Sequence, residues 1–336
     1  MSASTPPVPS PDLSARGLTV ERVAEHDRRA GDLALGVLLR GVPEPRDGSV
    51  RDFRQYLQHQ RGRLDNLWLA RRHGLPSAAA LVLRSPGRTG IVLQSPIRAL
   101  RQVEDASAAL ASATHAARAG DIALLQALIE FTQVHEQASL KRCGFQALAD
   151  LAYLRGPALR GDAVAETALP EGLRLWQYLP EHRAVFARAI LASYEQTLDC
   201  PGLLGLRSIE DVIEGHLSAG QFHPHLWWAL TRDDAPVGVC LLSLAPSLSA
   251  AELVYLGLAP AWRRKGLARL LMRRAMAAAG AHGAERVLLA VDEANAPAMA
   301  LYRSLGFEAT DRKLAMILPL GVDRSVGEAG GSRTNS

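Results

Sequence analysis

The apolar and polar positions between residues 252 and 269 change their period partway along. A short apolar run leads through Pro260 into basic residues around Gly266, and an amphipathic segment of Leu, Met, Arg and Ala follows. A continuous apolar run indicates a buried strand, whereas apolar positions three and four residues apart indicate a helix. The stretch therefore predicts a strand, a loop and a helix.

The next segment continues the alternation of strands and helices. The run ERVLLAV at 285–291 predicts a second buried strand. Asn295 then predicts the N-cap of a helix, and Gly306 is expected just past its end. A last strand is expected at 313–318. The order is strand, basic loop, helix, strand, helix, strand.

The loop chemistry favours an anion. A helix that begins near Gly266 directs its unpaired N–H groups and the positive end of its dipole at the loop, which suits a diphosphate. Glycine has no Cβ, so an anion can approach its backbone closely. Neither GxGxxG nor GxxxxGK[ST] occurs in the chain. Taken alone, the loop is equally well read as a solvated basic start of a helix.

The two motifs together resemble the GNAT superfamily of acyl-CoA-dependent N-acyltransferases. The matching residues are Arg263-x-x-Gly266-x-Ala268 and, after it, Asn295-x-x-Ala298-x-x-Leu301-Tyr302-x-x-x-Gly306-Phe307. The resemblance implies an α/β fold with a mixed, mostly antiparallel sheet flanked by helices. It also implies two central strands, 250–258 and 285–291, that splay apart to admit acyl-CoA.

The chain also resembles itself. Residues 67–83, LWLARRHGLPSAAALVL, are similar to residues 227–243, WWALTRDDAPVGVCLLS, at an offset of 160. Gly144-Phe145 matches Gly306-Phe307 at an offset of 162. Two features in one order at nearly one spacing indicate a tandem duplication.

The duplication predicts two domains of the same fold. The expected ranges are a disordered tail at 1–17, a GNAT-like domain at 18–156, a linker at 157–172, a catalytic domain at 173–320 and a second disordered tail at 321–336. In the first domain, helices are expected at 28–39, 50–60 and 103–118, with a short one ending near 143, and strands at 91–94, 123–129 and 148–154. In the second, a strand is expected at 173–179, with helices at 182–198 and 209–217.

The first copy lacks several of the residues that carry the resemblance. Its segment 101–106 reads RQVEDA, with two acids and no glycine. At an offset of 162, Leu140 takes the place of Tyr302 and Gln133 that of Asn295. We infer that the first domain keeps the fold without the cofactor site.

Composition narrows the function classes. With 48% hydrophobic and 21% charged residues, the chain is typical of a soluble globular protein. A net charge of +4 is too mild to indicate nucleic acid. There is no apolar run long enough to span a membrane and no signal-peptide pattern at the N-terminus, so we expect a cytoplasmic protein. Three widely separated cysteines indicate reduced thiols, and no metal site is expected.

The resemblance assigns roles to individual residues. Tyr302 matches the tyrosine that gives a proton to the departing thiolate, with core packing as the alternative. Glu252 matches the glutamate that acts as general base through water, with a strand-edge charge as the alternative. The predicted acetyl-CoA site consists of Leu256, Gly257, Leu258, Arg263, Arg264, Lys265, Gly266, Leu267, Ala268, Arg269 and Asn295.

The expected reaction follows from these roles. The amine of a small-molecule or peptide acceptor attacks acetyl-CoA directly in a ternary complex. A non-catalytic acyl-CoA-binding module is the alternative from another class. The acceptor, the acyl-chain preference and the oligomeric state are left open by the sequence.

Overall fold

The computed structural model describes residues 17–41, 48–59, 62–159 and 169–321. They form two compact units. The described residues of the first lie in 17–84 and 90–146, and those of the second in 85–89 and 147–321. Apart from Gly17 and Gly321, the two tails predicted to be disordered lie outside the described residues, as does most of the predicted linker.

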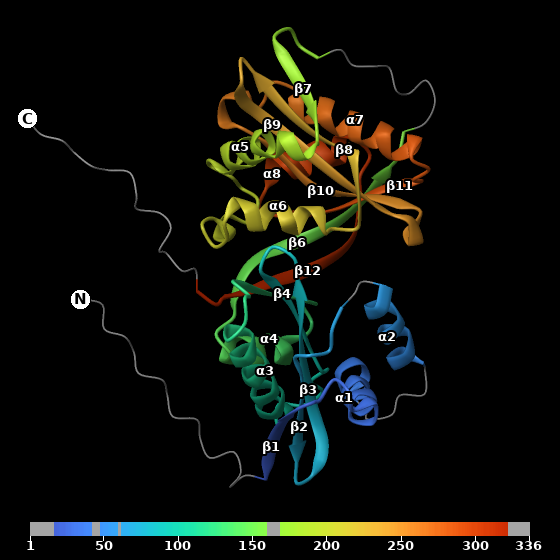
Figure 1. Cartoon of the computed structure of the whole chain (residues 1–336), viewed down its shortest axis with the longest axis vertical. Helices are drawn as coiled ribbons and strands as arrows, with labels where there is room; N and C mark the ends of the chain where they lie inside the picture. Colours follow the sequence, from blue (N-terminus) through green and yellow to red (C-terminus); the bar gives the residue numbers. More distant parts are fainter. Residues whose placement is uncertain (1–16, 42–47, 60–61, 160–168, 322–336) are drawn as a thin grey trace, which may run out of the picture. The chain divides into compact units, whose positions relative to one another are not determined.

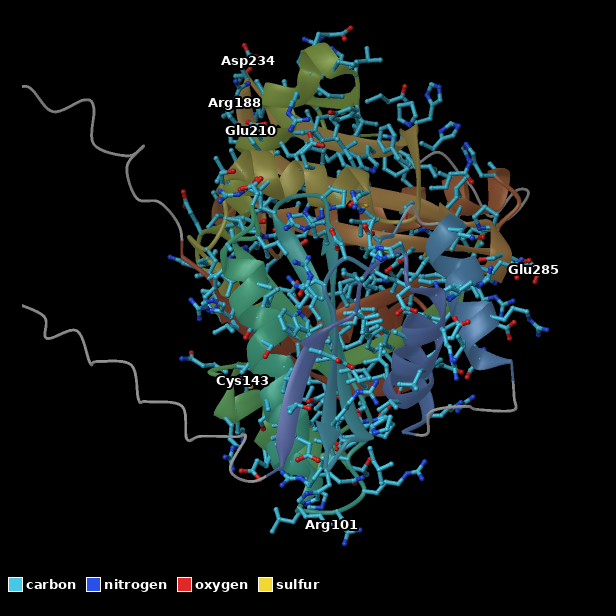
Figure 2. The ribbon with its side chains drawn as sticks, turned by 60° about the horizontal axis from the view of Figure 1, so that its bottom comes forward. Arg101, Cys143, Arg188, Glu210, Asp234 and Glu285 are labelled. Atoms are coloured by element: carbon cyan, nitrogen blue, oxygen red, sulfur yellow. The ribbon has the colours of Figure 1, made fainter. Side chains whose placement is uncertain are left out.

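The first unit is a mixed α/β unit with strand order β1-β2-β3-β4-β5 (Figure 1). Strand β2 pairs antiparallel with both β1 and β3. Its elements are β1 (Leu18–Arg22), α1 (Arg28–Arg40), α2 (Ser49–His59), β2 (Leu67–Arg72), β3 (Leu75–Ser85), β4 (Thr89–Gln94), α3 (Gln102–Arg118), β5 (Leu124–Ile129) and α4 (Val134–Arg142). Arg101 precedes α3 and points into solvent (Figure 2).

The second unit is built around a sheet with strand order β12-β6-β11-β10-β9-β8-β7. Its strands are β6 (Gln146–Pro157), β7 (Leu173–Gln177), β8 (Gln221–Arg232), β9 (Ala235–Ala245), β10 (Ala250–Leu258), β11 (Arg286–Asp292) and β12 (Glu308–Pro319). Its helices are α5 (Arg183–Tyr194), α6 (Ile209–Leu217), α7 (Leu267–Ala281) and α8 (Ala296–Ser304).

Both faces of this sheet are buried. Successive side chains of β9 point to opposite faces, so Cys240 and Leu242 pack with α7, whereas Val239 and Leu241 pack with α5. Because helices cover both faces, the central strands read as continuous apolar runs rather than alternating ones. The α/β fold with a mixed sheet flanked by helices, expected from the sequence, is confirmed.

The order of elements repeats along the chain. Strand, two helices, three strands, a helix, a strand and a helix run from β1 to α4, and the same order runs from β7 to α8. The repeat agrees with the duplication inferred from the sequence. Strand β6, which the sequence analysis gave to the first copy, pairs antiparallel with β11 of the second unit. The domain ranges themselves remain predictions.

The helix expected at 182–198 is shorter than predicted. It ends at Tyr194, and the residues after it leave helical geometry, with Gln196 at φ 51° and Cys200 at φ 45°. The predicted helix continued to residue 198, but tertiary contacts to the carbonyl groups of this segment, described below, hold it in another conformation. The last strand is longer than the predicted 313–318.

Candidate active site

Strands β10 and β11 separate partway along their length. They pair in parallel from Ala250 to Glu252 on β10, and the pairing stops there. Strand β10 continues beside β9 to Leu258, with an irregularity between Leu253 and Tyr255. Beyond Glu252, β10 therefore has one edge in the sheet and one edge that faces an opening. The splayed strands implied by the resemblance are present.

The backbone of β10 faces the opening at alternate residues. Ala259 N–H donates to the Val237 carbonyl beyond the end of β9. Because ladder bonds alternate along an antiparallel strand, the backbone groups of Leu256 and Leu258 point to the opening, and those of Gly257 point to β9. Gly257 is needed for packing, because an added Cβ would lie 2.4 Å from Ser193 Oγ on α5.

One of these backbone groups is already bonded. The Leu258 carbonyl accepts a bond of 3.0 Å from Arg263 Nε. The assignment of Leu256, Gly257 and Leu258 to the acetyl-CoA site stays a prediction, and the Leu258 carbonyl has one acceptor position already filled by this bond. Of the three residues, Leu256 has the backbone groups that are best placed to bond a ligand in the opening.

The loop before α7 exposes a row of backbone donors. Gly266, its N-cap, has φ 79° and provides no side-chain cap. Within the described parts of the chain, the backbone N–H groups of residues 264–269 have no hydrogen-bond partner. A Cβ at Gly266 would meet nothing within 4 Å, so the space in front of the helix is open. Such a row of N–H groups at the positive end of a 15-residue helix fits a diphosphate.

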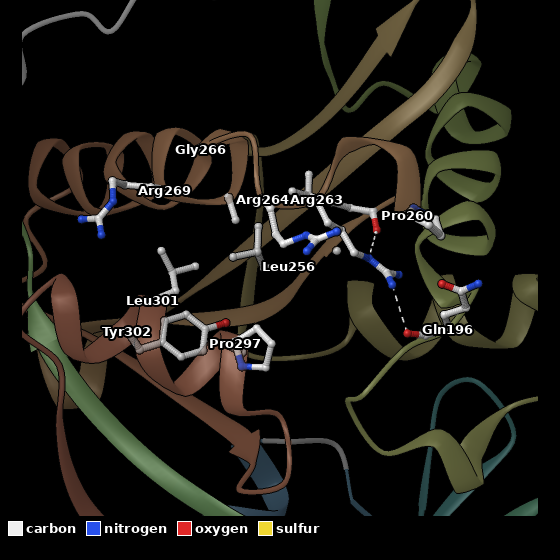
Figure 3. A pocket seen from close by; sticks show the side chains of 14 residues that line it. Gln196, Leu256, Pro260, Arg263, Arg264, Gly266, Arg269, Pro297, Leu301 and Tyr302 are labelled. Atoms are coloured by element: carbon white, nitrogen blue, oxygen red, sulfur yellow. Dashed lines mark hydrogen bonds between the residues drawn. The ribbon is translucent and has the colours of Figure 1, made fainter.

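The cations of this loop differ in what they contact. The Arg263 guanidinium is bonded to the protein, because it donates to the carbonyls of Ser193 at 3.1 Å and Glu195 at 2.6 Å. It also donates to the Gln196 carbonyl at 3.0 Å, as Figure 3 shows. It clamps the segment after α5 to the end of β10. The loop's other cations differ from it: Arg264 is exposed, Lys265 lies 4.8 Å from the Trp262 ring centre, and Arg269 donates to Ser304 Oγ at 2.7 Å.

A cavity of about 600 Å³ joins the loop to the opening. It is bounded by Gly266 and Arg264 on one side, by Leu256 of β10, and by Pro297, Leu301 and Tyr302 of α8. Figure 3 shows Tyr302 pointing from its helix toward Leu256 and Pro297. Cations and N–H groups lie at one end of the cavity and apolar side chains in the middle. This arrangement suits a long ligand with an anionic head.

Tyr302 lines this cavity and a smaller one beside it. The side chain is 6% exposed and lies against Phe307, with 5.7 Å between the ring centres. Burial raises the pKa of Tyr302 above its ordinary value. The phenol is therefore protonated at neutral pH, which is the state a proton donor needs.

Asn295 and Glu252 take different places. The Asn295 side chain caps α8 by accepting from Ala298 N–H at 3.3 Å, as the sequence predicted. Glu252 lies at the last paired position of the splay, where the side chain is exposed and borders neither cavity. The surrounding protein still raises its pKa by partial desolvation. Its role as general base stays a prediction.

Sequence reasoning missed Asp199. The smaller cavity, of about 50 Å³, is lined by Asp199 together with Tyr255, Asn295 and Tyr302. Asp199 follows a segment that the sequence analysis placed in a continuous helix, so no local pattern marked it. Only the early end of α5 brings this carboxyl group to the opening. In the described residues, there is no group of three or more His, Cys, Asp or Glu side chains arranged to hold a metal ion.

The class of the site agrees with the comparisons to known proteins. Residues 194–307 match the family model described as acetyltransferase (GNAT) family. The match begins at the end of α5 and ends after α8, so it contains the loop, the splayed strands and Tyr302. The resemblance drawn from the sequence is therefore confirmed for this segment.

Two curated relatives match part of the chain. A mycothiol acetyltransferase of Beutenbergia cavernae is 36% identical over 156 residues, which are 43% of this chain and 48% of that protein. A mycothiol acetyltransferase of Thermobifida fusca is 38% identical over 81 residues, or 24% of this chain and 23% of that one. The chain thus matches about half or less of the length of these curated relatives.

A solved structure shows the same fold. The GCN5-related N-acetyltransferase from Sphaerobacter thermophilus aligns with a TM-score of 0.59 at 17% identity, over 94% of this chain and 99% of that one. No helix among the described residues is long and apolar enough to cross a membrane.

Proposed function

We propose that the chain is an N-acetyltransferase that moves an acetyl group from acetyl-CoA to a primary amine by direct attack in a ternary complex. The observation that carries the proposal is the cavity that joins the unpartnered N–H row of residues 264–269 to the splayed edge of β10. Acetyl-CoA, when bound, supplies the activated thioester.

Residues of this chain have separate tasks in the proposal. The N–H groups at the start of α7 and the Arg264 side chain bind the diphosphate. The Leu256 backbone at the open edge pairs with the pantetheine arm. Tyr302 donates a proton to the sulfur as the carbon–sulfur bond breaks. Arg263 takes part by holding the α5 segment beside β10 rather than by binding phosphate.

The acceptor needs a group that takes its ammonium proton. Glu252 is the residue predicted for this from the sequence, and its raised pKa suits a base. The acceptor itself is a small molecule or a peptide with a primary amine. Because the curated relatives are mycothiol acetyltransferases, acetylation of the corresponding amine precursor is the second candidate.

Tyr302→Phe tests the enzyme against a non-catalytic acyl-CoA-binding module. We expect kcat to fall about 100-fold or more, as for loss of a general acid, while the calorimetric Kd for acetyl-CoA stays within about twofold, because the ring keeps its packing. Tyr178→Phe, which removes another buried hydroxyl, is the control. Full turnover in Tyr302→Phe would contradict the acid role, and binding of acetyl-CoA without acetylation of any amine would favour the binding module.

A further inference from the structure

The smaller cavity contains a carboxyl group that the proposed reaction has not used. Asp199 lines the cavity with Tyr255 of β10, Asn295 at the start of α8 and Tyr302, and it is the only acidic residue among the lining residues. Leu256 and Tyr302 border both cavities, so the smaller one adjoins the place where the thioester of a bound acyl-CoA is expected.

Hydrogen bonds fix the Asp199 carboxylate in place. Its Oδ1 accepts from Asp292 N–H at 3.2 Å, at the end of β11, and its side chain also accepts from Asn295. In return, Asp292 Oδ2 accepts from Cys200 N–H at 3.2 Å. This reciprocal pair fastens the 199–200 segment to the strand that splays from β10. A carboxylate offers about four acceptor positions, so these bonds leave capacity for a proton or an amine.

The charged and titratable surroundings suit proton transfer. Burial raises the pKa of Asp199 and the nearby charge of Asp292 adds to this, while the hydrogen bonds from Asp292 and Asn295 oppose it. Tyr194, Tyr255 and Tyr302 each sense the Asp199 charge, which raises their pKa values further beyond the effect of burial. A carboxyl group that can accept a proton and a phenol that can donate one therefore line the same small cavity.

We propose that Asp199, rather than Glu252, accepts the proton of the acceptor ammonium beside the thioester. This inference rests on the proposed function. Glu252 is exposed, borders neither cavity and lies at the last paired position of β10 and β11, whereas Asp199 lines the smaller cavity together with Tyr302.

The step balances as follows. An ammonium R–NH3⁺ gives one proton to the Asp199 carboxylate, which later passes it to solvent. The freed nitrogen forms a bond to the thioester carbon, and the carbon–sulfur bond breaks. Tyr302 gives a proton to the leaving sulfur and regains the second proton lost by nitrogen. The products are the amide, the thiol form of CoA and one proton.

Asp199→Asn tests this role with little change in shape, since the amide oxygen can still accept from Asp292 N–H. Wild type, Asp199→Asn, Glu252→Gln and the control Glu195→Gln, an exposed carboxyl in the same segment, are compared. CoA release is measured from pH 6 to 10 with a panel of primary amines: cysteine amide, glucosamine, spermidine and a peptide with a free N-terminus. Acetyl-CoA affinity is measured by calorimetry for each variant.

For Asp199→Asn we expect kcat/KM to fall about 100-fold at pH 7, the scale of general-base catalysis. The Kd for acetyl-CoA should stay within about twofold, because the N–H groups of residues 264–269 that are proposed to bind the diphosphate are unchanged. The deficit should shrink as pH rises, because an amine that is already neutral needs no base. Glu252→Gln should lose less than Asp199→Asn, and Glu195→Gln should resemble wild type.

Four results would overturn the inference. A deficit in Asp199→Asn that is equal at every pH, or a comparable loss of acetyl-CoA affinity, would indicate a structural role. A larger loss in Glu252→Gln would assign the base to Glu252. If wild type binds acetyl-CoA and acetylates no amine, the proposed function itself fails, and the role of Asp199 fails with it.

Discussion

The two crossover helices, α3 and α7, begin differently although they occupy the same place in the two copies. At an offset of 162, Glu104 corresponds to Gly266 and Asp105 to Leu267. Helix α3 begins at Gln102, three residues earlier in the repeat than α7, so the loop has become part of the helix. Arg72 donates to Glu104 at 2.8 Å and to Asp105 at 2.9 Å. In the first copy, two carboxylates bonded to Arg72 thus occupy the place that corresponds to the open loop before α7.

The space beside the last helix of each copy, α4 or α8, also differs. In the first copy, the buried Glu136 accepts from Ile97 N–H at 2.7 Å, and Gln94 donates to the Glu136 carbonyl at 3.0 Å. These bonds tie α4 to the chain after β4. In the second copy the residue at the Glu136 position is Ala298, which lines both cavities. In the first copy, the larger Glu136 side chain fills this position and forms internal hydrogen bonds. In the second copy, the smaller Ala298 leaves the space open.

The largest expected effect comes from making the second copy resemble the first at its helix start. In Gly266→Glu, a carboxylate faces the diphosphate, and like charges in contact cost several kcal/mol. We expect wild type to bind one acetyl-CoA per chain and the variant to bind at least about 100-fold more weakly, measured by calorimetry. Gly283→Glu is the matched control, because Gly283 also has positive φ and open space. Two sites per chain would contradict a closed first copy.

Next in size is the arginine that the copies share, Arg263 and Arg101. Arg263 bonds four carbonyls, and lysine cannot reproduce this fork. We expect Arg263→Lys to lower the free energy of unfolding by about 1–2 kcal/mol and to weaken acetyl-CoA binding about tenfold, which corresponds to 1.4 kcal/mol. Denaturant titration and calorimetry measure the two. Arg101→Lys, at the exposed counterpart in the first copy, should change neither stability nor acetyl-CoA affinity. If Arg263→Lys had the stability and affinity of wild type, the proposed clamp would be refuted.

The smallest effect on the proposed reaction is expected in the first copy. Glu136→Ala leaves the Ile97 N–H buried without its partner, which costs about 1–3 kcal/mol of stability. Glu136→Gln, which keeps an acceptor, should cost less. Both should bind acetyl-CoA like wild type. If Glu136→Ala lowered only stability, the contrast between the two copies would be supported. If it created a second acetyl-CoA site, that contrast would be weakened.

The pH dependence of activity follows from the raised pKa of Asp199. The carboxylate must be unprotonated to act, so its contribution to kcat/KM is present above its pKa in the protein and is lost as pH falls through it. Because the pKa is raised, the loss begins at a higher pH than for an ordinary aspartate. In a pH–rate profile, Asp199→Asn should remove the fall in kcat/KM that comes from protonation of Asp199. The pH dependence that comes from the acceptor amine should remain.

Much of the second copy could be predicted from sequence because its signals are local. Asn295 as a cap, Gly266 at positive φ and the apolar run of β10 each act over a few residues. The loop before α7 and Tyr302 could be singled out from the sequence for the same reason, because each lies within a short local motif. These local patterns could not predict two features that depend on tertiary structure. Arg263 donates to carbonyls 67 to 70 residues away, and β6 pairs with β11.

Asp199 shows the division most clearly. Its sequence neighbours resemble the continuation of a helix, and local periodicity carries no information about bonds to Asp292, 93 residues further on. Burial and a fixed set of partners turn an ordinary carboxyl group into one with a raised pKa. The fold class and the place of the loop before α7 could be predicted from local patterns in the sequence. Which carboxyl group lies beside Tyr302 could not, because only packing brings residues that are distant in the sequence together.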